Sequence, residues 1–351
     1  MPSEGSTGRL LQLCLGYFVF YVFFGVAVKW LRGPLEMNSI AILTFTTMGG
    51  TGIVFPIVIL RRWYKLHSNE SVTKFGIRFP REYLYIIPSG ICTAIVIPTT
   101  TLMYTLPITV MVAMTIMRAS IIVVSRIVDS IQMRQGLMTR RVYPEENIAI
   151  VLALGAVGVH LFYGAKNDGG FDFMGDPAAM TILSCYIGFY AVRIYLMNYF
   201  KNTRAPGVKL DNHGFFAIEQ FAAMASILLM LGALLLFAGD GPRMMLFKEA
   251  ASSPPPNWFW GVVAGVPFGL AAFFSVFIYM FKGRTATFAG LVNRLTSLVA
   301  GTMATLIFWL GFDGQSPKPQ DWIALGFIFA SVLFLSSAER KRAGRTASEQ
   351  R

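Results

Sequence analysis

Charged residues are scarce in this chain of 351 amino acids, since Asp, Glu, Lys and Arg make up 14% of it, against 55% hydrophobic residues. A soluble domain normally carries about a quarter charged residues, so the composition argues against a soluble globular fold. Cysteine is rare as well, and Cys14, Cys92 and Cys185 each lie inside an apolar stretch. The sequence therefore offers no disulfide framework and no cysteine metal site, and we expect three buried thiols.

Motifs of membrane-embedded enzymes are also missing. The sequence contains no His-Glu-x-x-His, no glycine loop that would cradle a phosphate, and no carboxylate pair suited to holding a pyrophosphate through magnesium. A membrane-embedded glycosyl or lipid-phosphate enzyme, the alternative from another class, would need a carboxylate-metal or nucleophile cluster of this kind. We expect no enzymatic activity, no cofactor and no bound metal.

Long apolar stretches are what the sequence has in abundance, and its mean hydropathy is +0.57. Crossing a hydrocarbon layer of about 30 Å takes roughly 20 apolar residues in a helix. The stretches cover 10–28, 38–60, 83–103, 107–129, 147–163, 177–200, 214–238, 257–281, 286–310 and 320–338. They predict an all-α integral membrane protein with ten transmembrane helices, of which the fifth is short.

The basic residues are distributed unevenly between the two sets of connecting segments. If the N-terminus is cytosolic, 20 of the 30 Lys and Arg residues fall on the cytosolic side, six on the opposite side and four within the stretches. This asymmetry follows the positive-inside rule and predicts that both termini are cytosolic. The net charge of +12 therefore indicates topology and contacts with membrane lipids rather than a nucleic-acid partner.

The sequence does not distinguish between membranes, since a bacterial inner membrane and a Golgi or ER membrane fit equally well. The basic tail, 339–351, is expected to be disordered.

The two halves of the chain are weakly similar to each other. A shift of about 175 residues places Arg118 near Arg294 and lays Gly90 and Ala94 on Gly265 and Gly269, the kind of internal symmetry found in inverted-repeat transporters. Five helices in each half would give the halves opposite orientations in the membrane. We therefore predict an inverted repeat, with an N-terminal unit, 1–163, and a C-terminal unit, 164–351, and a substrate site between them.

Arg118 and Arg294 are the clearest candidates for function, because each lies in the middle of an apolar stretch. A buried arginine in a membrane is costly, so it is normally held by a partner or by a ligand. The guanidinium is permanently charged and can bind phosphate or carboxylate through a planar fork. We expect both arginines to bind a small anionic solute, and the structural alternative is that each pairs with a carboxylate or with helix carbonyls.

The ninth stretch contains Gly290-Leu-Val-Asn293-Arg294-Leu295, followed by Ala300-Gly301. It resembles the Gly-Ala-Leu-Asn-Lys-Leu and Ser-Gly pattern of GDP-mannose-type transporters, in the nucleotide-sugar branch of the drug/metabolite transporter superfamily. The resemblance implies ten helices in a 5+5 plan and a nucleotide-sugar contact at Gly290, Asn293 and Arg294. The paired asparagines of that family's seventh helix are replaced here by Ala217-Ile-Glu-Gln220. Triose-phosphate translocators also carry a basic residue in this region, so an organic phosphate fits as well.

Other ionisable residues have local explanations. Arg126 and Asp129 are one helical turn apart and are expected to form an ion pair. Arg193 is expected to reach the cytosolic interface. For Glu219 we consider three roles, in order of preference: partner of a basic residue, contact to substrate hydroxyls, and site of proton coupling.

Tyrosines can stack on bases or bind sugar hydroxyls, although most aromatic side chains only pack. Tyr17 and Tyr21 share one face of the first stretch, and Tyr190 and Tyr279 lie in the sixth and eighth. Tyr279 is the best candidate of these, because Lys282 follows at the cytosolic mouth. A glycine stripe in the eighth stretch, at 261, 265 and 269, is expected to pack within the bundle, with a homodimer contact as the alternative.

Together these patterns predict a secondary transporter that carries a phosphorylated organic anion, most simply a nucleotide sugar, by alternating access. Because no second central carboxylate suggests a proton wire, exchange or facilitated transport is favoured over proton coupling. The main alternative is an exporter of amino acids or amphipathic metabolites.

Overall fold

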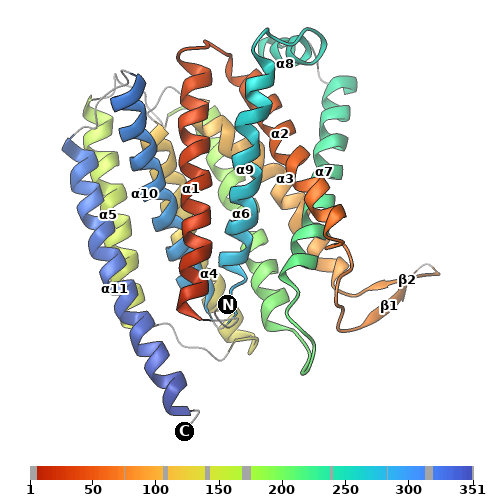
Figure 1. Ribbon diagram of the computed structural model, residues 1–351, viewed down its shortest axis with the longest axis vertical. Coiled ribbons are helices and arrows are strands. Elements are labelled where there is room, and N and C mark those ends of the chain that lie inside the picture. Colours follow the sequence, from red (N-terminus) through yellow and green to blue (C-terminus); the bar gives the residue numbers. More distant parts are fainter. Residues whose placement is uncertain are drawn as a thin grey trace.

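The computed structural model describes residues 6–349 except 75, 106–109, 139–142, 168–174, 238, 240, 283 and 313–318. The described chain forms eleven helices and one antiparallel hairpin (Figure 1). The helices are α1 (Thr7–Arg32), α2 (Ser39–Leu60), α3 (Tyr83–Thr105), α4 (Val110–Arg134), α5 (Pro144–Asn167), α6 (Pro177–Asn202), α7 (Asn212–Phe237), α8 (Pro242–Ser252), α9 (Trp258–Tyr279), α10 (Ala286–Phe312) and α11 (Pro319–Glu349). The hairpin pairs β1 (Ser71–Lys74) with β2 (Ile77–Pro80).

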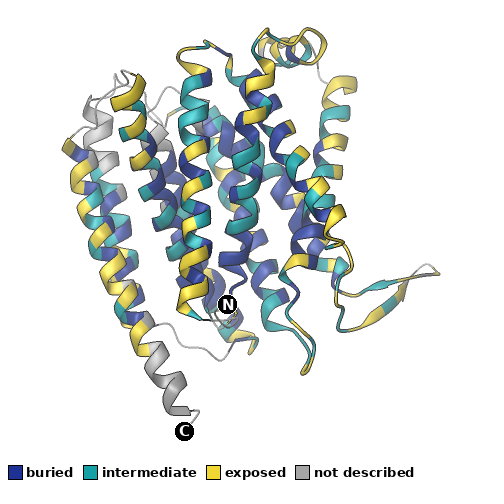
Figure 2. Cartoon of the chain, viewed as in Figure 1, coloured by how far each residue is buried: buried dark blue, intermediate teal, exposed yellow. Residues whose placement is uncertain are grey.

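Each of the ten expected stretches coincides with one long helix, apart from 107–109 and 238, which lie outside the described residues. The ends agree to within a few residues except in α11, which continues eleven residues beyond the expected end at 338. Seven helices, α1, α2, α3, α6, α7, α9 and α10, are long and apolar enough to cross a membrane. Large apolar side chains such as Leu60 and Phe237 are more than four-fifths exposed. Exposed residues follow the outer faces of the helices in Figure 2. Such an apolar exterior is expected of a protein surrounded by lipid.

Polar caps determine where several helices begin. The side chains of Ser6, Asn38 and Asp176 accept hydrogen bonds from backbone N–H groups two or three residues later, at 3.3, 2.8 and 2.8 Å. The first N–H groups of a helix have no partner within the helix, so these side chains satisfy donors that would otherwise be lost.

The helix pairs of the bundle come in matching sets. The contact between α2 and α9 matches that between α7 and α3, and the contact between α1 and α9 matches that between α6 and α3. α1 also packs on α10, as α6 does on α4, while α4 meets α10 and α5 meets α11. Both chain ends and the hairpin lie at one end of the bundle, and α8 lies at the other (Figure 1).

Glycines allow two of these helix pairs to approach very closely. A Cβ on Gly265 would lie 2.2 Å from the carbonyl oxygen of Thr46, and one on Gly269 would lie 2.3 Å from that of Gly50, so α9 and α2 meet backbone to backbone. On the α3–α7 side, a Cβ on Gly90 would lie 2.6 Å from the carbonyl oxygen of Glu219. The expectation that the glycine stripe packs within the bundle is confirmed, and its surface is not available to a second copy of the chain.

We expect Gly265→Ala to destabilise the protein, because the added methyl group would force α2 and α9 apart. Overpacking of this kind costs about 1–3 kcal/mol. The matched control is Gly188→Ala on α6, an exposed position with nothing within 4 Å of the added atom, where alanine should gain up to about 1 kcal/mol of helix propensity. Thermal unfolding of both purified variants provides the test, and equal stabilities would contradict the close α2–α9 contact.

Two expectations about the chain ends and loops were wrong. The tail is not disordered up to residue 349, because α11 continues to Glu349, and Lys341 forms an ion pair with Glu145 at the start of α5. Hydropathy alone also missed α8 and the hairpin, which lie in segments that were expected to be plain loops.

The expected ion pair between Arg126 and Asp129 was also wrong. Asp129 is fully buried and accepts hydrogen bonds from the backbone N–H groups of Ala286 at 2.8 Å and Thr287 at 2.6 Å. These groups are the unpaired donors at the start of α10, where the helix dipole favours a negative charge. Asp129 therefore joins α4 to the start of α10. These are the two helices that carry Arg118 and Arg294.

Candidate functional site

A small cavity of about 80 Å³ lies in the middle of the bundle. Both Arg118 of α4 and Arg294 of α10 line it, so the structure brings together the two arginines that the sequence singled out. The other lining residues, from α1, α3, α6, α7 and α9, are Tyr17, Tyr21, Thr93, Val96, Ile97, Thr100, Tyr190, Arg193, Gln220, Phe268, Ala271, Ala272 and Ser275. We call this space the arginine cavity.

Arg294 is 1% exposed and is the largest fully buried side chain among the described residues. Its guanidinium carbon lies 4.6 Å from the ring centre of Tyr190 and 5.8 Å from that of Tyr279, in the range of cation–π contacts. Its Nε and Nη2 atoms are buried without a hydrogen-bond partner, and Arg294 forms no salt bridge with any residue that the structure describes. The buried charge is therefore held by the Tyr190 and Tyr279 rings and by a side-chain hydrogen bond with Tyr190, while Nε and Nη2 remain as unused donors.

Arg118 is 4% exposed and is held in a similar way from the other half of the chain. Its Nη2 donates a hydrogen bond to the hydroxyl of Tyr21, and its guanidinium carbon lies 5.2 Å from the centre of the same ring. Arg118 on α4 thus contacts α1, while Arg294 on α10 contacts α6. Because the cavity is small, the two positive charges repel each other, and an anion between them would relieve that repulsion.

The third arginine, Arg193, does not reach an interface, and that expectation was wrong. It is 6% exposed and forms a bidentate salt bridge with Glu219, with Nε–Oε1 at 2.9 Å and Nη2–Oε2 at 3.0 Å. Ser89 and Thr93 donate to the same carboxylate, at 2.7 and 3.2 Å. Of the three roles considered for Glu219, the first is the one that this geometry matches. The pair is neutral overall, so it does not cancel the charge of the other two arginines.

The remaining candidates surround Arg294 but do not line the cavity. The amide of Asn293 donates to Ser275 at 3.0 Å, and its Oδ1 is buried without a partner. The hydroxyl of Tyr279 is also buried without one. Gly290 faces α4 instead of the cavity, since an added Cβ would lie 2.4 Å from the hydroxyl of Ser125. In this conformation, its lack of a side chain serves helix packing rather than close approach to a ligand.

Several buried polar atoms without a hydrogen-bond partner belong to Arg294, to its neighbours or to the cavity lining. They are two nitrogens of Arg294, the Tyr186 hydroxyl, the Tyr279 hydroxyl, Asn293 Oδ1 and Gln220 Nε2. Buried polar groups are almost always hydrogen-bonded, so these atoms are available to a ligand or to ordered water. Donors and acceptors of this kind, next to two guanidinium groups, can bind an anion that also carries hydroxyl or amide groups.

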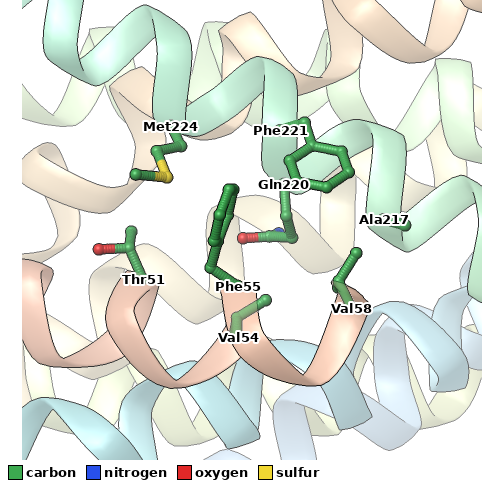
Figure 3. A pocket seen from close by; sticks show the side chains of 8 residues that line it. All are labelled: Thr51, Val54, Phe55, Val58, Ala217, Gln220, Phe221 and Met224. Atoms are coloured by element: carbon green, nitrogen blue, oxygen red, sulfur yellow. The ribbon is translucent and has the colours of Figure 1, made fainter. Parts of the chain in front are cut away.

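Gln220 links the arginine cavity to the outside of the bundle. It lines that cavity and also a narrow pocket between α2 and α7, where its side chain extends from α7 towards Phe55 (Figure 3).

Several cavity residues were not predicted from the sequence. Gln220 stood out only as a departure from the paired asparagines, and no local pattern marked Ser275, Thr93 or Thr100 as cavity residues. Tyr17, Tyr21 and Tyr190 were noticed but were expected mainly to pack. Among the described residues, no group of three or more His, Cys, Asp or Glu side chains could hold a metal ion.

No family model matches this sequence, and neither does any of the curated proteins. Among solved structures, one described only as "Crystal structure of protein" has a TM-score of 0.54 with this chain at 16% sequence identity. The match covers 93% of this chain and 98% of the other. At that identity, the similarity shows a shared fold and nothing more.

Proposed function

We propose that this protein is a secondary transporter that carries a phosphorylated organic anion across the membrane by alternating access. The observation that carries the proposal is Arg294, a fully buried guanidinium with unpaired donors and no carboxylate partner among the described residues, in one cavity with Arg118. An ionisable group in the membrane interior usually belongs to a substrate or ion pathway. A structural subunit would have no need of such a charge.

We further propose that α4, α5 and α11 also cross the membrane and that the ten long helices form two inverted five-helix repeats, 1–163 and 164–351. The packing supports this, because the main pairs join one half to the other, and each has a counterpart in which the halves are exchanged, such as α2–α9 and α7–α3. Gly90 and Gly265, which align in the sequence, lie at corresponding close contacts, Gly90 between α3 and α7 and Gly265 between α9 and α2. Transporters with inverted repeats bind substrate near the middle of the membrane, between the repeats.

Both termini and the basic loops would face the cytosol in this arrangement. Support comes from the 20 to six distribution of Lys and Arg and from the position of both chain ends at one end of the bundle (Figure 1). Single cysteines in loops 61–82 and 164–176 should react with impermeant reagents from opposite sides of the membrane. Labelling of both from the same side would refute the topology.

The arginine cavity must expand during the transport cycle. At about 80 Å³ it offers room for only a few water molecules, each of which takes about 30 Å³ in the liquid. A sugar phosphate or nucleotide sugar therefore needs the helices around the cavity to separate, as they do when an occluded carrier opens. We take the structure to be a closed conformation of the cycle.

A nucleotide sugar is the favoured cargo, with exchange or facilitated transport favoured over proton coupling. The Gly290-Leu-Val-Asn293-Arg294-Leu pattern supports that choice, and so do the buried Asn293 amide and the Tyr190 and Tyr279 rings, which suit a base or sugar. A smaller organic phosphate is the second choice, because Ala217-Ile-Glu-Gln220 replaces the paired asparagines. An exporter of amino acids or amphipathic metabolites would not need two guanidinium groups in one cavity, of which Arg294 has no carboxylate partner among the described residues.

The purified protein in liposomes loaded with nucleotide monophosphates should take up labelled nucleotide sugars or sugar phosphates. Uptake should depend on the internal anion if the mechanism is exchange. A parallel panel of amino acids and an uncharged glycoside serves as the control, because a site with two arginines should reject both. Transport of amino acids without transport of any phosphate would refute the proposal.

A further inference from the structure

A second, larger cavity of about 480 Å³ lies at the end of the bundle that holds both chain ends. Six Lys and Arg side chains line it against one carboxylate, Asp211. The lining residues, from α1, α7, α9 and the loops after α2, before α7 and after α9, are Arg9, Leu13, Arg61, Arg62, Trp63, Lys65, His67, Val208, Lys209, Leu210, Asp211, Asn212, His213, Phe277, Phe281 and Lys282. We call this space the basic vestibule, and its volume falls in the range of small-molecule sites.

The one carboxylate in the vestibule already has its partners. Asp211 accepts hydrogen bonds from the backbone N–H groups of His67 at 3.0 Å and Gly214 at 2.8 Å, and it contacts the His67 ring at 3.0 Å. Burial opposes its charge, but these hydrogen bonds hold the pKa of Asp211 below its ordinary value. Asp211 therefore serves to fix the loop before α7 onto the loop after α2.

The basic side chains, by contrast, have room for a ligand. Arg61, Arg62, Lys65 and Lys282 make no side-chain hydrogen bond or ion pair with any residue in the described part of the chain. The loops that carry the first three are held by contacts outside the vestibule, including a buried salt bridge of 2.8 Å between Arg204 and Glu82. The side chains of Arg61, Arg62, Lys65 and Lys282 are exposed, so their positive charges are accessible to an anion that enters the vestibule.

Arg62 has a backbone conformation that supports a specific role. Its φ is +54°, in the left-handed region where a residue that ends a helix is usually glycine. This turn after α2 sends the chain back so that Arg61, Arg62 and Trp63 all line the vestibule. Non-glycine residues in this conformation are uncommon and tend to occur at functional sites.

Aromatic rings pack against one another at the wall of the vestibule. Trp63 stacks on Phe273 with ring centres 5.5 Å apart and lies 4.5 Å from the His213 ring, which in turn lies 4.8 Å from Phe277. The two cavities share α1, where Leu13 lines the vestibule and Tyr17 the arginine cavity. Those residues are one helical turn apart, about 6 Å along the axis. The two cavities are therefore neighbours along α1.

We propose that the basic vestibule binds a soluble phosphorylated anion, with its phosphate groups between Arg61, Arg62 and Lys282 and a planar group against Trp63. Its place as the first docking position of the cargo rests on the transport function proposed above. Guanidinium groups suit the first step because they bind phosphate oxygens in a fork and stack on aromatic rings.

Pyrophosphate is a suitable minimal probe, and Trp63 is a built-in reporter for it. In nanodiscs of phosphatidylcholine at constant ionic strength, pyrophosphate should change the fluorescence of the intact protein, and Trp63→Phe should abolish the change. Arg61→Gln combined with Arg62→Gly should weaken apparent affinity at least 10-fold, where glycine keeps the left-handed turn. The control, Arg78→Gln with Arg134→Gln, removes equal charge from exposed positions outside the vestibule and should change affinity less than twofold.

Three further arms decide between explanations. Arg118→Gln with Arg294→Gln should keep the Trp63 response, and its loss would overturn the proposal by placing the anion in the arginine cavity. A response to phosphatidylglycerol in the nanodisc but not to pyrophosphate would also overturn it, because the ligand would then be a lipid headgroup. In liposomes, the vestibule variant should raise KM at least 10-fold with little change in kcat. A vestibule that binds pyrophosphate in a protein that transports nothing would refute the transport function but not the site.

Discussion

Arg294→Gln should weaken binding of a phosphorylated anion by about 10- to 150-fold, because it removes a charge-assisted contact of roughly 1.5–3 kcal/mol. Arg294 is suited to this role because its buried donors have no carboxylate to satisfy them in the described structure. Arg118→Gln should have an effect of the same order, since both guanidinium groups line one cavity. An uncharged analogue should lose much less affinity in either variant.

Arg294→Lys separates charge from geometry. Lysine keeps the positive charge but loses the planar fork and much of the contact with the Tyr190 and Tyr279 rings, so it should retain more affinity than glutamine and less than arginine. Binding and thermal stability should be measured on the same preparations. A folded glutamine variant that binds the anion with unchanged affinity would end the anion-site hypothesis. Loss of folding together with equal loss for charged and uncharged ligands would favour a purely structural arginine.

The long helices were predictable because an apolar stretch of about 20 residues is visible in the sequence, without knowing which helices pack around it. The hairpin is different, because its strands have only four residues each and the loops around it are held by contacts distant in sequence, such as Glu82 with Arg204. The same holds for the start of α10, where Asp129 bonds two N–H groups more than 150 residues further along the chain. The spacing of residues along one helix could suggest only the neighbouring Arg126 as a partner for Asp129.

The arginine cavity was predictable in part for a similar reason. A charge inside an apolar stretch is visible in the sequence, so Arg118 and Arg294 stood out, and the weak repeat suggested that they would meet. Nothing local shows that Arg193 has a carboxylate partner on α7, so it was assigned to an interface. For Gly290 the motif suggested a ligand contact, which stays a prediction, while the packing of Gly290 against the Ser125 hydroxyl could not be read from the sequence.

The Arg193–Glu219 salt bridge provides the largest predicted effect on stability. Glu219→Leu should destabilise the protein by about 3–5 kcal/mol, because it leaves the Arg193 guanidinium, 6% exposed, without its partner. It also removes the acceptor for the Ser89 and Thr93 hydroxyls. Arg193→Met should cost a comparable amount, because a buried carboxylate would remain with only those two hydroxyl donors.

The double variant, Arg193→Met with Glu219→Leu, should be more stable than either single variant. Replacing both charges with apolar groups of similar size leaves no unpaired ion, and in soluble proteins such replacements are often neutral or stabilising. Unfolding in mixed micelles would give a double-mutant cycle. Because each single variant should cost about 3–5 kcal/mol and the double variant less than either, the coupling should be at least about 3 kcal/mol. Ser89→Ala is the matched control, because it removes one hydrogen bond to Glu219 and should cost only about 1 kcal/mol. Additive effects of the two charge substitutions would mean that the salt bridge does not hold α6 and α7 together beside the arginine cavity.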